Sequence, residues 1–242
     1  MLSDTEARNA LIVALDCDRA RALELTDLLA DHARWVKVGM TLFYRYGPGI
    51  VQEMKDRGFN VFLDLKVHDI PFQVHGAVRS ASLSGADIIS IHALGGSHMI
   101  ASGRSGAAEA AEIRGVGEEG RTKLVAISIL TSMNEEDLSS IGVRDTVVSE
   151  VERLAKLSYN AGADGLVCSA QEASSMREIL GPEALIITPG IRPRGAEKGD
   201  QQRTATPASA IAAGASKLVI GRPITEAKDP CMAFEEIVKE LI

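Results

Sequence analysis

SGADIISIHA, residues 84–93, contains the end of one predicted helix and the whole of the strand that follows it. The glycine suits the left-handed backbone that ends a helix, and the Ile-rich run after it is typical of a buried strand. The same order recurs as AGADGLVCS (161–169) and AGASKLVIGR (213–222). A helix that leads directly into a strand, repeated along one chain, indicates a parallel sheet covered by helices.

The rest of the chain contains enough units of this kind to close a barrel. Short runs rich in Val and Ile alternate with stretches of helical spacing, such as 19–31, 146–161 and 231–241. The predicted strands are LIVALDC (11–17), WVKVG (35–39), VFLDLKV (61–67), DIISIHA (87–93), KLVAISI (123–129), GLVCS (165–169), ALIITPGI (184–191) and KLVIGR (217–222). With no linker or composition break, they predict a single (β/α)8 TIM barrel over residues 1–242 rather than an open doubly wound sheet.

Charged residues occupy strand positions that should face the barrel interior. In VFLDLKV the odd-numbered apolar residues form the face against the helices, so Asp64 and Lys66 point inward near the carboxyl-terminal mouth. The same alternation turns Asp16 and Lys37 inward on the two preceding strands. With Asp69 just beyond, these residues predict a reaction centre. The alternative is a purely structural ion-pair network, which stabilises weakly compared with apolar packing.

The loops after the last two predicted strands indicate a phosphate site. Two long connections, 131–145 and 192–206, are expected on the carboxyl-terminal face, where barrel active sites and mobile lids lie. Phosphate is often bound by the loops after strands seven and eight. Gly221 offers a backbone N–H there, and Arg222 a planar cation. Two further donors could come from the second connection: Arg192 and Gln201.

Composition argues against polyanionic and membrane partners. A net charge of −7 and a pI near 5.3 leave no basic field to attract nucleic acid or an anionic membrane. No run approaches the roughly 20 apolar residues that span a bilayer, and MLSDTEARNA lacks the features of a signal peptide. No HExxH zinc motif occurs. We expect a cytoplasmic protein whose partners are small molecules and other copies of itself.

The sequence resembles the orotidine 5′-phosphate decarboxylase family, which performs the last step of de novo UMP synthesis. The resemblance covers nearly the whole chain, and DLKVHDIP (64–71) is its most specific segment. Weaker matches follow in family order: LIVALD with Asp16, VKVG with Lys37, LTSM with Thr131, TPGIRP with Arg192, GDQ with Gln201, and VIGRP with Gly221 and Arg222. The resemblance implies decarboxylation of orotidine 5′-monophosphate to UMP and CO2 by a homodimer, without a metal or organic cofactor.

The resemblance also implies a role for each matching residue. Lys66 would protonate C6 of the pyrimidine, Asp64 would face the departing CO2, and Lys37 would lie between Asp64 and the ribose. Asp69 would enter the neighbouring subunit's site. Substrate contacts are implied for the rest: Asp16 at the ribose, Ile70 and Pro71 in the motif, Thr131 or Ser132 at the pyrimidine edge, and Arg192, Gln201, Gly221 and Arg222 at the phosphate.

Two alternative functions stay open. One is a related barrel that resembles 3-keto-L-gulonate-6-phosphate decarboxylase or hexulose-6-phosphate synthase, which use Mg2+ and carry an acidic residue where this chain has Lys37. A lysine there replaces a metal ligand with a positive charge, which disfavours a divalent cation. The other is a catalytically silent nucleotide-binding scaffold. A broken charge set would indicate such a scaffold, and here every member of the set is present.

Overall fold

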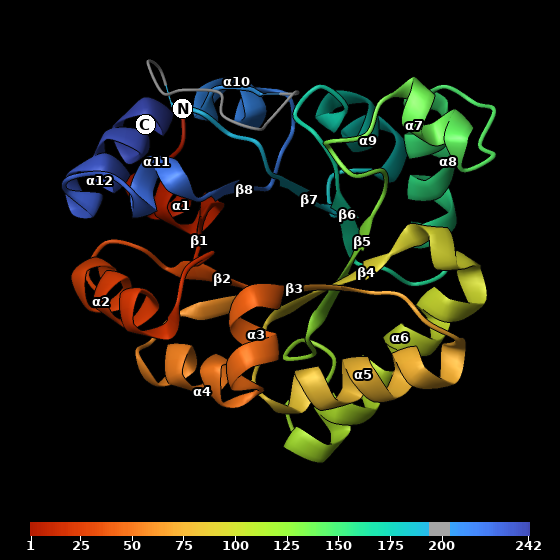
Figure 1. Ribbon diagram of the computed structural model, residues 1–242, viewed down its shortest axis with the longest axis horizontal. Helices are drawn as coiled ribbons and strands as arrows, with labels where there is room; N and C mark the ends of the chain where they lie inside the picture. Colours follow the sequence, from red (N-terminus) through yellow and green to blue (C-terminus); the bar gives the residue numbers. More distant parts are fainter. Residues whose placement is uncertain (194–203) are drawn as a thin grey trace.

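Eight parallel strands form one closed barrel in the part of the chain that the computed structural model describes, residues 1–193 and 204–242. The strands pair in chain order, β8 pairs with β1, and helices surround them (Figure 1). Their bounds are β1 (Leu11–Ala14), β2 (Trp35–Gly39), β3 (Asn60–Val67), β4 (Ile88–His92), β5 (Lys123–Ile127), β6 (Gly165–Val167), β7 (Leu185–Thr188) and β8 (Lys217–Ile220). The predicted (β/α)8 TIM barrel is therefore confirmed.

The helices include the three that the sequence predicts most clearly, which correspond to α2, α8 and α12. The described helices are α1 (Asp4–Ala10), α2 (Arg19–Leu29), α3 (Met40–Tyr46), α4 (Gly49–Asp56), α5 (Pro71–Leu83), η1 (Ala93–Gly95), α6 (Gly96–Arg114), α7 (Glu135–Ser140), α8 (Val147–Asn160), α9 (Ala173–Leu180), α10 (Pro207–Ala212), α11 (Arg222–Thr225) and α12 (Pro230–Leu241). Among them, none combines the length and the apolar character that a membrane crossing requires.

One expected connection, 131–145, contains the short helix α7. The Asn134 side chain accepts the backbone N–H of Asp137 (3.0 Å), and the Asp137 carboxylate accepts the backbone N–H of Asn134 (2.9 Å). This capping box satisfies amides that would otherwise lack partners at the helix start. With Asp137, Glu135 and Glu136 place negative charge at the positive end of the helix dipole. End effects, rather than apolar periodicity, therefore stabilise this helix.

The repeated helix-to-strand motif braces the strands in pairs at their amino-terminal ends. Its glycines, residues 85, 162 and 214, have φ of 95°, 99° and 100°, as the predicted left-handed helix ends require. The side chain of the residue just before β4, β6 or β8 then accepts a backbone N–H from the preceding strand. The three bonds are Val61 to Asp87 (2.7 Å), Leu124 to Asp164 (2.7 Å) and Ile186 to Ser216 (3.1 Å). One local sequence thus fixes the register of three strand pairs.

Alternating strand residues divide the core into two layers. The predicted outward residues lie in the layer between strands and helices: Leu11, Val13, Leu15, Val36, Val38, Val61 and Leu63. A second buried cluster fills the barrel interior: Ile12, Phe62, Ile88, Val125, Ile127, Val167 and Ile187. The predicted inward direction of the even positions on β3 is therefore correct, and Phe62 lies one inward position below Asp64.

A buried lysine closes the amino-terminal end of the barrel. The Lys217 ammonium donates to the backbone oxygen of Asn9 (2.7 Å) and lies 3.9 Å from the centre of the Trp35 ring. The indole N–H of Trp35 donates to the Asn9 side chain (2.7 Å). Burial lowers the pKa of Lys217 to about 8. The charged amine is therefore held at some cost to stability, which cation–π attraction partly offsets.

Lys217→Met should remove a pH-dependent part of the stability. Because the folded pKa lies below the ordinary 10.5, the unfolded chain binds more protons between pH 8 and 10.5, so the free energy of unfolding rises with pH. From about pH 7 to about pH 9.5 the wild type should gain about 2 kcal/mol relative to the variant. Urea denaturation of both proteins measures this difference. An equal difference at both pH values would contradict the lowered pKa.

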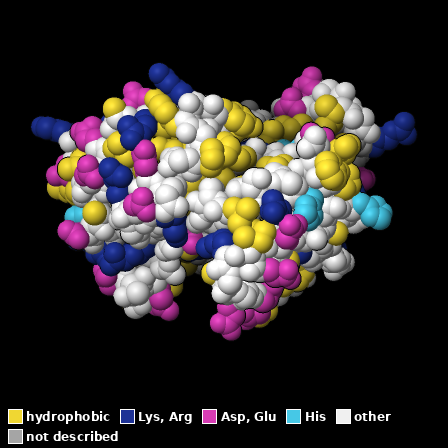
Figure 2. Space-filling view, turned by 90° about the horizontal axis from the view of Figure 1, so that it is seen from below, with side chains coloured by type: hydrophobic (Ala, Val, Ile, Leu, Met, Phe, Trp, Pro, Cys, Tyr) yellow, Lys and Arg dark blue, Asp and Glu magenta, His cyan; other side chains and the backbone are white. Residues whose placement is uncertain are grey.

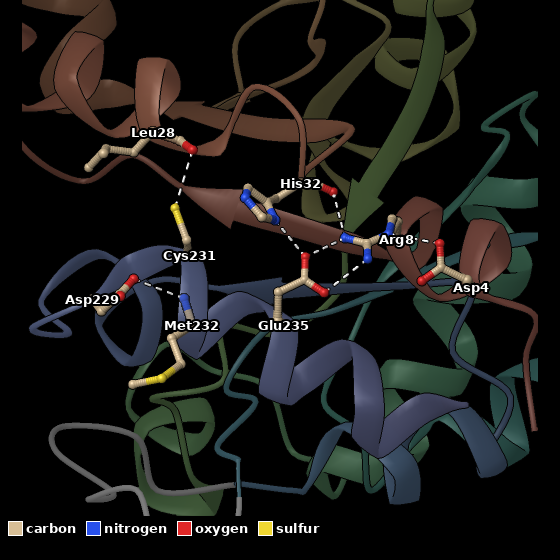
Figure 3. A network of polar contacts seen from close by, with 8 residues as sticks. All are labelled: Asp4, Arg8, Leu28, His32, Asp229, Cys231, Met232 and Glu235. Carbon is tan, nitrogen blue, oxygen red and sulfur yellow. Dashed lines mark hydrogen bonds and ion pairs between the residues drawn. The ribbon is translucent and has the colours of Figure 1, made fainter.

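A carboxylate on the last helix ties together the two ends of the chain. The Glu235 side chain accepts two hydrogen bonds from Arg8 (2.7 and 2.9 Å) and lies 2.6 Å from Nδ1 of His32, as Figure 3 shows. Arg8 also pairs with Asp4 at 2.9 Å. The hydrogen bond from Arg8 is the largest effect, and with the bond from His32 it lowers the pKa of Glu235 to about 2, although burial acts in the opposite direction. Glu235 thus joins α1, α12 and the segment before β2.

Glu235→Gln should reduce stability at neutral pH and have less effect in acid. Because the pKa of Glu235 is lower in the folded protein than its ordinary value of 4.5, the ionised carboxylate stabilises the fold at pH values above 4.5. That stabilisation is lost as the pH falls towards 2. The side chain is partly exposed, so we expect a loss of about 1–2 kcal/mol at neutral pH. Denaturation at neutral pH and below 4.5 tests this. As a control, Glu53→Gln removes the carboxylate that pairs with Arg19. This ion pair is more exposed than that of Glu235 with Arg8, so its loss should lower the free energy of unfolding by less.

Candidate active site

A cavity of about 510 Å3 opens at the carboxyl-terminal ends of the strands. Its lining residues come from seven of the eight strands, all except β4, or from the segments that follow those strands: Ala14, Asp16, Lys37, Phe62, Asp64, Lys66, Ile127, Ile129, Leu130, Thr131, Val167, Pro189, Gly190, Arg192, Val219, Gly221, Arg222, Thr225 and Glu226. This is the end of a TIM barrel at which active sites lie. Charged residues and an apolar floor therefore share one small space.

Four charged side chains form a continuous chain of alternating sign along one wall. The Lys37 ammonium lies 2.7 Å from a carboxylate oxygen of Asp16 and 3.8 Å from one of Asp64. The Lys66 ammonium lies 2.8 Å from the same oxygen of Asp64. Lys37 and Asp64 are nearly buried, with side-chain exposures of 8% and 12%. The structure thus brings together the four inward charges that strand alternation predicts.

The two lysines keep Asp64 ionised although it is buried. Burial by itself would raise the pKa of this carboxyl, but the charges of Lys66 and Lys37 outweigh it. Hydrogen bonds from Lys66 and Ser90 act in the same direction. The pKa of Asp64 is therefore held below its usual range.

The predicted phosphate residues that the structure describes lie in the segments after β7 and β8, and β8 pairs with β1, the strand before Asp16. Arg192, Gly221 and Arg222 line the cavity beyond β7 and β8, and Thr131 lines it beyond β5. The Arg192 guanidinium donates to the backbone oxygen of Ile191 (2.9 Å). Ser132, the predicted alternative to Thr131, is exposed and is not among the lining residues, whereas Gln201 lies outside the described residues.

The end of the motif lies outside the lining of the cavity in its own chain. Asp69, Ile70 and Pro71 are exposed and are not among its described lining residues. The Asp69 carboxylate accepts the backbone N–H of Ile70 (2.6 Å), and Pro71 begins α5. The structure therefore separates Asp69 from Asp64 and Lys66, although only a few residues lie between them in the sequence.

Sequence reasoning missed two parts of the site. One is the apolar floor, to which Phe62, Ile127 and Val167 contribute. The other is Ser90 on β4, whose hydroxyl donates to Asp64 (2.8 Å). The alternation that predicted the charged residues also turns Ser90 inward, so it could have been found. It was overlooked because serine carries no charge whose burial would need an explanation.

Comparison with known proteins identifies the family. The model of the orotidine 5′-phosphate decarboxylase / HUMPS family matches residues 9–237, which include every described residue of the cavity. The chain belongs to this family. A family member named orotidine 5′-phosphate decarboxylase, from Vibrio cholerae serotype O1, is 46% identical over 233 residues, covering 96% of this chain and 98% of the relative.

Other members of the orotidine 5′-phosphate decarboxylase / HUMPS family agree in sequence and fold. A relative of the same name from Chromohalobacter salexigens is 46% identical and covers 96% of this chain and 95% of its own. The crystal structure of orotidine 5′-phosphate decarboxylase from Lactobacillus acidophilus matches with a TM-score of 0.82 and 37% identity, covering 96% of this chain and 98% of that one. The barrel of this chain therefore has the same fold as a solved structure that bears this family's name.

Proposed function

We propose that the protein decarboxylates orotidine 5′-monophosphate (OMP) to UMP and CO2 in de novo pyrimidine synthesis. Its family and the name of its relatives support the reaction. The observation that carries the proposal is the alternating chain from Asp16 through Lys37 and Asp64 to Lys66. It provides fixed charges where a nucleotide could enter, in a cavity of a size that suits a small ligand.

Lys66 is proposed to stabilise and then protonate the carbon that loses CO2. When the bond between C6 and the carboxylate breaks, the electron pair stays in an orbital in the plane of the ring, which delocalises it poorly. The barrier must therefore fall through charge that is already in place. The Lys66 ammonium, held 2.8 Å from Asp64, is such a charge. Its proton then forms the new C6–H bond, and solvent reprotonates the amine.

Asp64 and Lys37 are proposed to act on the same step through charge. Asp64 would repel the substrate carboxylate before CO2 leaves and interact less unfavourably afterwards, a ground-state contribution. Lys37, 3.8 Å from Asp64, keeps that carboxylate ionised and would face the ribose. A positive charge at this position also disfavours a divalent cation, so the proposed reaction uses no metal.

Binding of the phosphate is proposed for the loops after β7 and β8. Arg192 and Arg222 supply planar cations that suit phosphate oxygens, and Gly221 can offer a backbone N–H. These residues lie across the barrel from Lys66, far from the reacting carbon. Binding energy at such a remote group can order the site around the reacting atoms. Thr131, which lines the cavity beyond β5, is proposed to contact the pyrimidine edge.

We further propose that the functional unit is a homodimer in which Asp69 completes the partner's site. Asp69 is exposed and does not line the cavity of its own chain, and its neighbours Ile70 and Phe72 are 63% and 82% exposed. Figure 2 views the α3–α6 side and shows hydrophobic side chains at the surface among charged ones. Large apolar residues that are exposed next to Asp69 suit contact with a second copy of the chain, which would bury them.

A cytoplasmic location is proposed from the substrate's chemistry. OMP carries a phosphate and a carboxylate, and burying such charges in a bilayer is strongly unfavourable. The enzyme and its substrate are therefore expected in the same aqueous compartment. Cell fractionation would test this, and activity confined to the membrane or to the outside of the cell would contradict it.

A spectrophotometric assay with OMP in the presence of EDTA tests the proposed reaction. We expect full turnover, because fixed lysine charges rather than a divalent cation would stabilise the carbanion. Turnover abolished by EDTA and restored by Mg2+ would favour a metal-dependent relative such as a 3-keto-L-gulonate-6-phosphate decarboxylase or hexulose-6-phosphate synthase. Tight binding of a UMP analogue without any turnover would favour a nucleotide-binding scaffold.

A further inference from the structure

The strand that carries the reaction residues has a bulge opposite one serine. β3 and β4 pair at Leu63 with Ile89 and next at Val67 with Ile91. Three residues of β3, 64–66, therefore face the single residue Ser90. Lys66 has a φ of 52°, and among the described residues it is the one non-glycine residue with positive φ. Bulges and left-handed backbone at non-glycine residues cluster at functional sites, where they direct side chains.

The Ser90 hydroxyl bonds both to the backbone of the bulge and to the side chain of Asp64. Its oxygen accepts the backbone N–H of Lys66 (2.9 Å), and its O–H donates to Asp64 Oδ1 (2.8 Å). A hydroxyl can do both at once, because it has one donor and two acceptor positions. Ser90 is fully buried, so no solvent replaces these bonds. The other carboxylate oxygen, Oδ2, remains for Lys66 and Lys37.

We infer that Ser90 is a positioning residue for the Asp64–Lys66 pair. One hydroxyl fixes both the rotation of the Asp64 carboxylate and the strained backbone from which the Lys66 side chain extends. Without it, Asp64 can turn about its Cβ–Cγ bond and the Lys66 backbone can relax, which displaces the ammonium from the position that the reacting carbon requires. The kinetic consequence rests on the proposed decarboxylation, but the geometric one does not.

The kinetic test compares Ser90→Ala with Ser90→Thr, which keeps a hydroxyl. Since misplacing a reacting group by an ångström can cost about 100-fold, we expect Ser90→Ala to lower kcat for OMP by about 10- to 100-fold, with a smaller change in KM. Loss of a donor to Asp64 should also move the acidic limb of the kcat–pH profile to higher pH. Ser90→Thr should restore most of both properties. The control Ser82→Ala removes a fully buried hydroxyl on α5 and should leave kcat unchanged.

Three kinetic results would overturn the inference. They are a kcat for Ser90→Ala within about twofold of wild type, an acidic limb that does not move, and equal losses in Ser90→Thr and Ser90→Ala. If Ser90→Ala does not fold, Ser90→Cys nearly preserves the size but replaces the hydroxyl with a weak donor, and it should show the same trends.

A structural measurement separates this inference from the proposed reaction. Crystal structures of the wild type and Ser90→Ala should show a rotated Asp64 carboxylate and a changed φ at Lys66 in the variant. Unchanged positions of both side chains would refute the positioning role even if the protein decarboxylates OMP. Displaced side chains in a protein whose wild type shows no turnover would support the positioning role and reject the reaction.

Discussion

Lys66→Ala should abolish the turnover of OMP and leave the barrel folded. The variant would lose both the proposed proton donor and the proposed cation beside the developing carbanion. General acids contribute about 10²–10⁴-fold and a preorganised charge about 10²–10³-fold, so we expect a fall in kcat of at least about 10⁴-fold. The fold should survive because Asp64 keeps its contacts with Lys37 and Ser90. Single-turnover kinetics together with circular dichroism measure the two effects separately.

A second lysine provides the matched control for this experiment. Lys217 is also largely buried, but it lies at the opposite end of the barrel. Lys217→Met should therefore keep kcat near the wild-type value, while its stability changes with pH as described above. If Lys66→Ala retained activity within about tenfold of wild type, Lys66 could not be the general acid at C6.

Mixing two inactive variants, Asp69→Ala and Lys66→Ala, should restore activity. In a mixed dimer one site would combine the intact Lys66 of one chain with the intact Asp69 of the other. Random exchange makes about half of the dimers mixed, each with one intact site, so about one quarter of wild-type activity should return. Activity measured against time after mixing, with subunit exchange followed by native mass spectrometry, tests this expectation.

The control for this experiment mixes Lys66→Ala with Asp64→Ala. Both residues line the cavity of the same chain, so every site of a mixed dimer would still lack one of them. No activity should return. Recovery in this control, or no recovery with Asp69→Ala after confirmed exchange, would count against a site shared between subunits.

Strand order and inward charges could be predicted because they depend on local patterns. Runs of Val and Ile predict the strand starts to within one residue. The predicted ends of β2 and β3 are also correct, but the other six are too late: β1 ends at Ala14 instead of residue 17, for example, and β7 at Thr188 instead of 191. Residues beyond these ends, such as Leu15 and Ile191, are still buried. An apolar pattern therefore continues after the strand pairing has stopped, and composition alone cannot mark that boundary.

Features that depend on contacts between distant segments could not be predicted in this way. The bulge at residues 64–66 is a mismatch between two strands, and neither strand shows it alone. The hydrogen bonds between Ser90 and Asp64 and between Glu235 and Arg8 join residues far apart in the chain. The exposed position of Asp69 depends on where the chain turns after β3. Alternation predicts the face that a side chain occupies, but not its partner.

The braces at Asp87, Asp164 and Ser216 have a consequence for how this barrel can change. They hold the strand pairs at one end, whereas Lys37, Asp64 and Lys66 act at the other. Loops at the mouth can therefore be exchanged or redesigned with little disturbance of strand register. Because the strand pairs are held at the amino-terminal end, substitutions at the carboxyl-terminal end can change the reaction with little effect on stability. The protein is therefore a suitable scaffold for the design of new active sites.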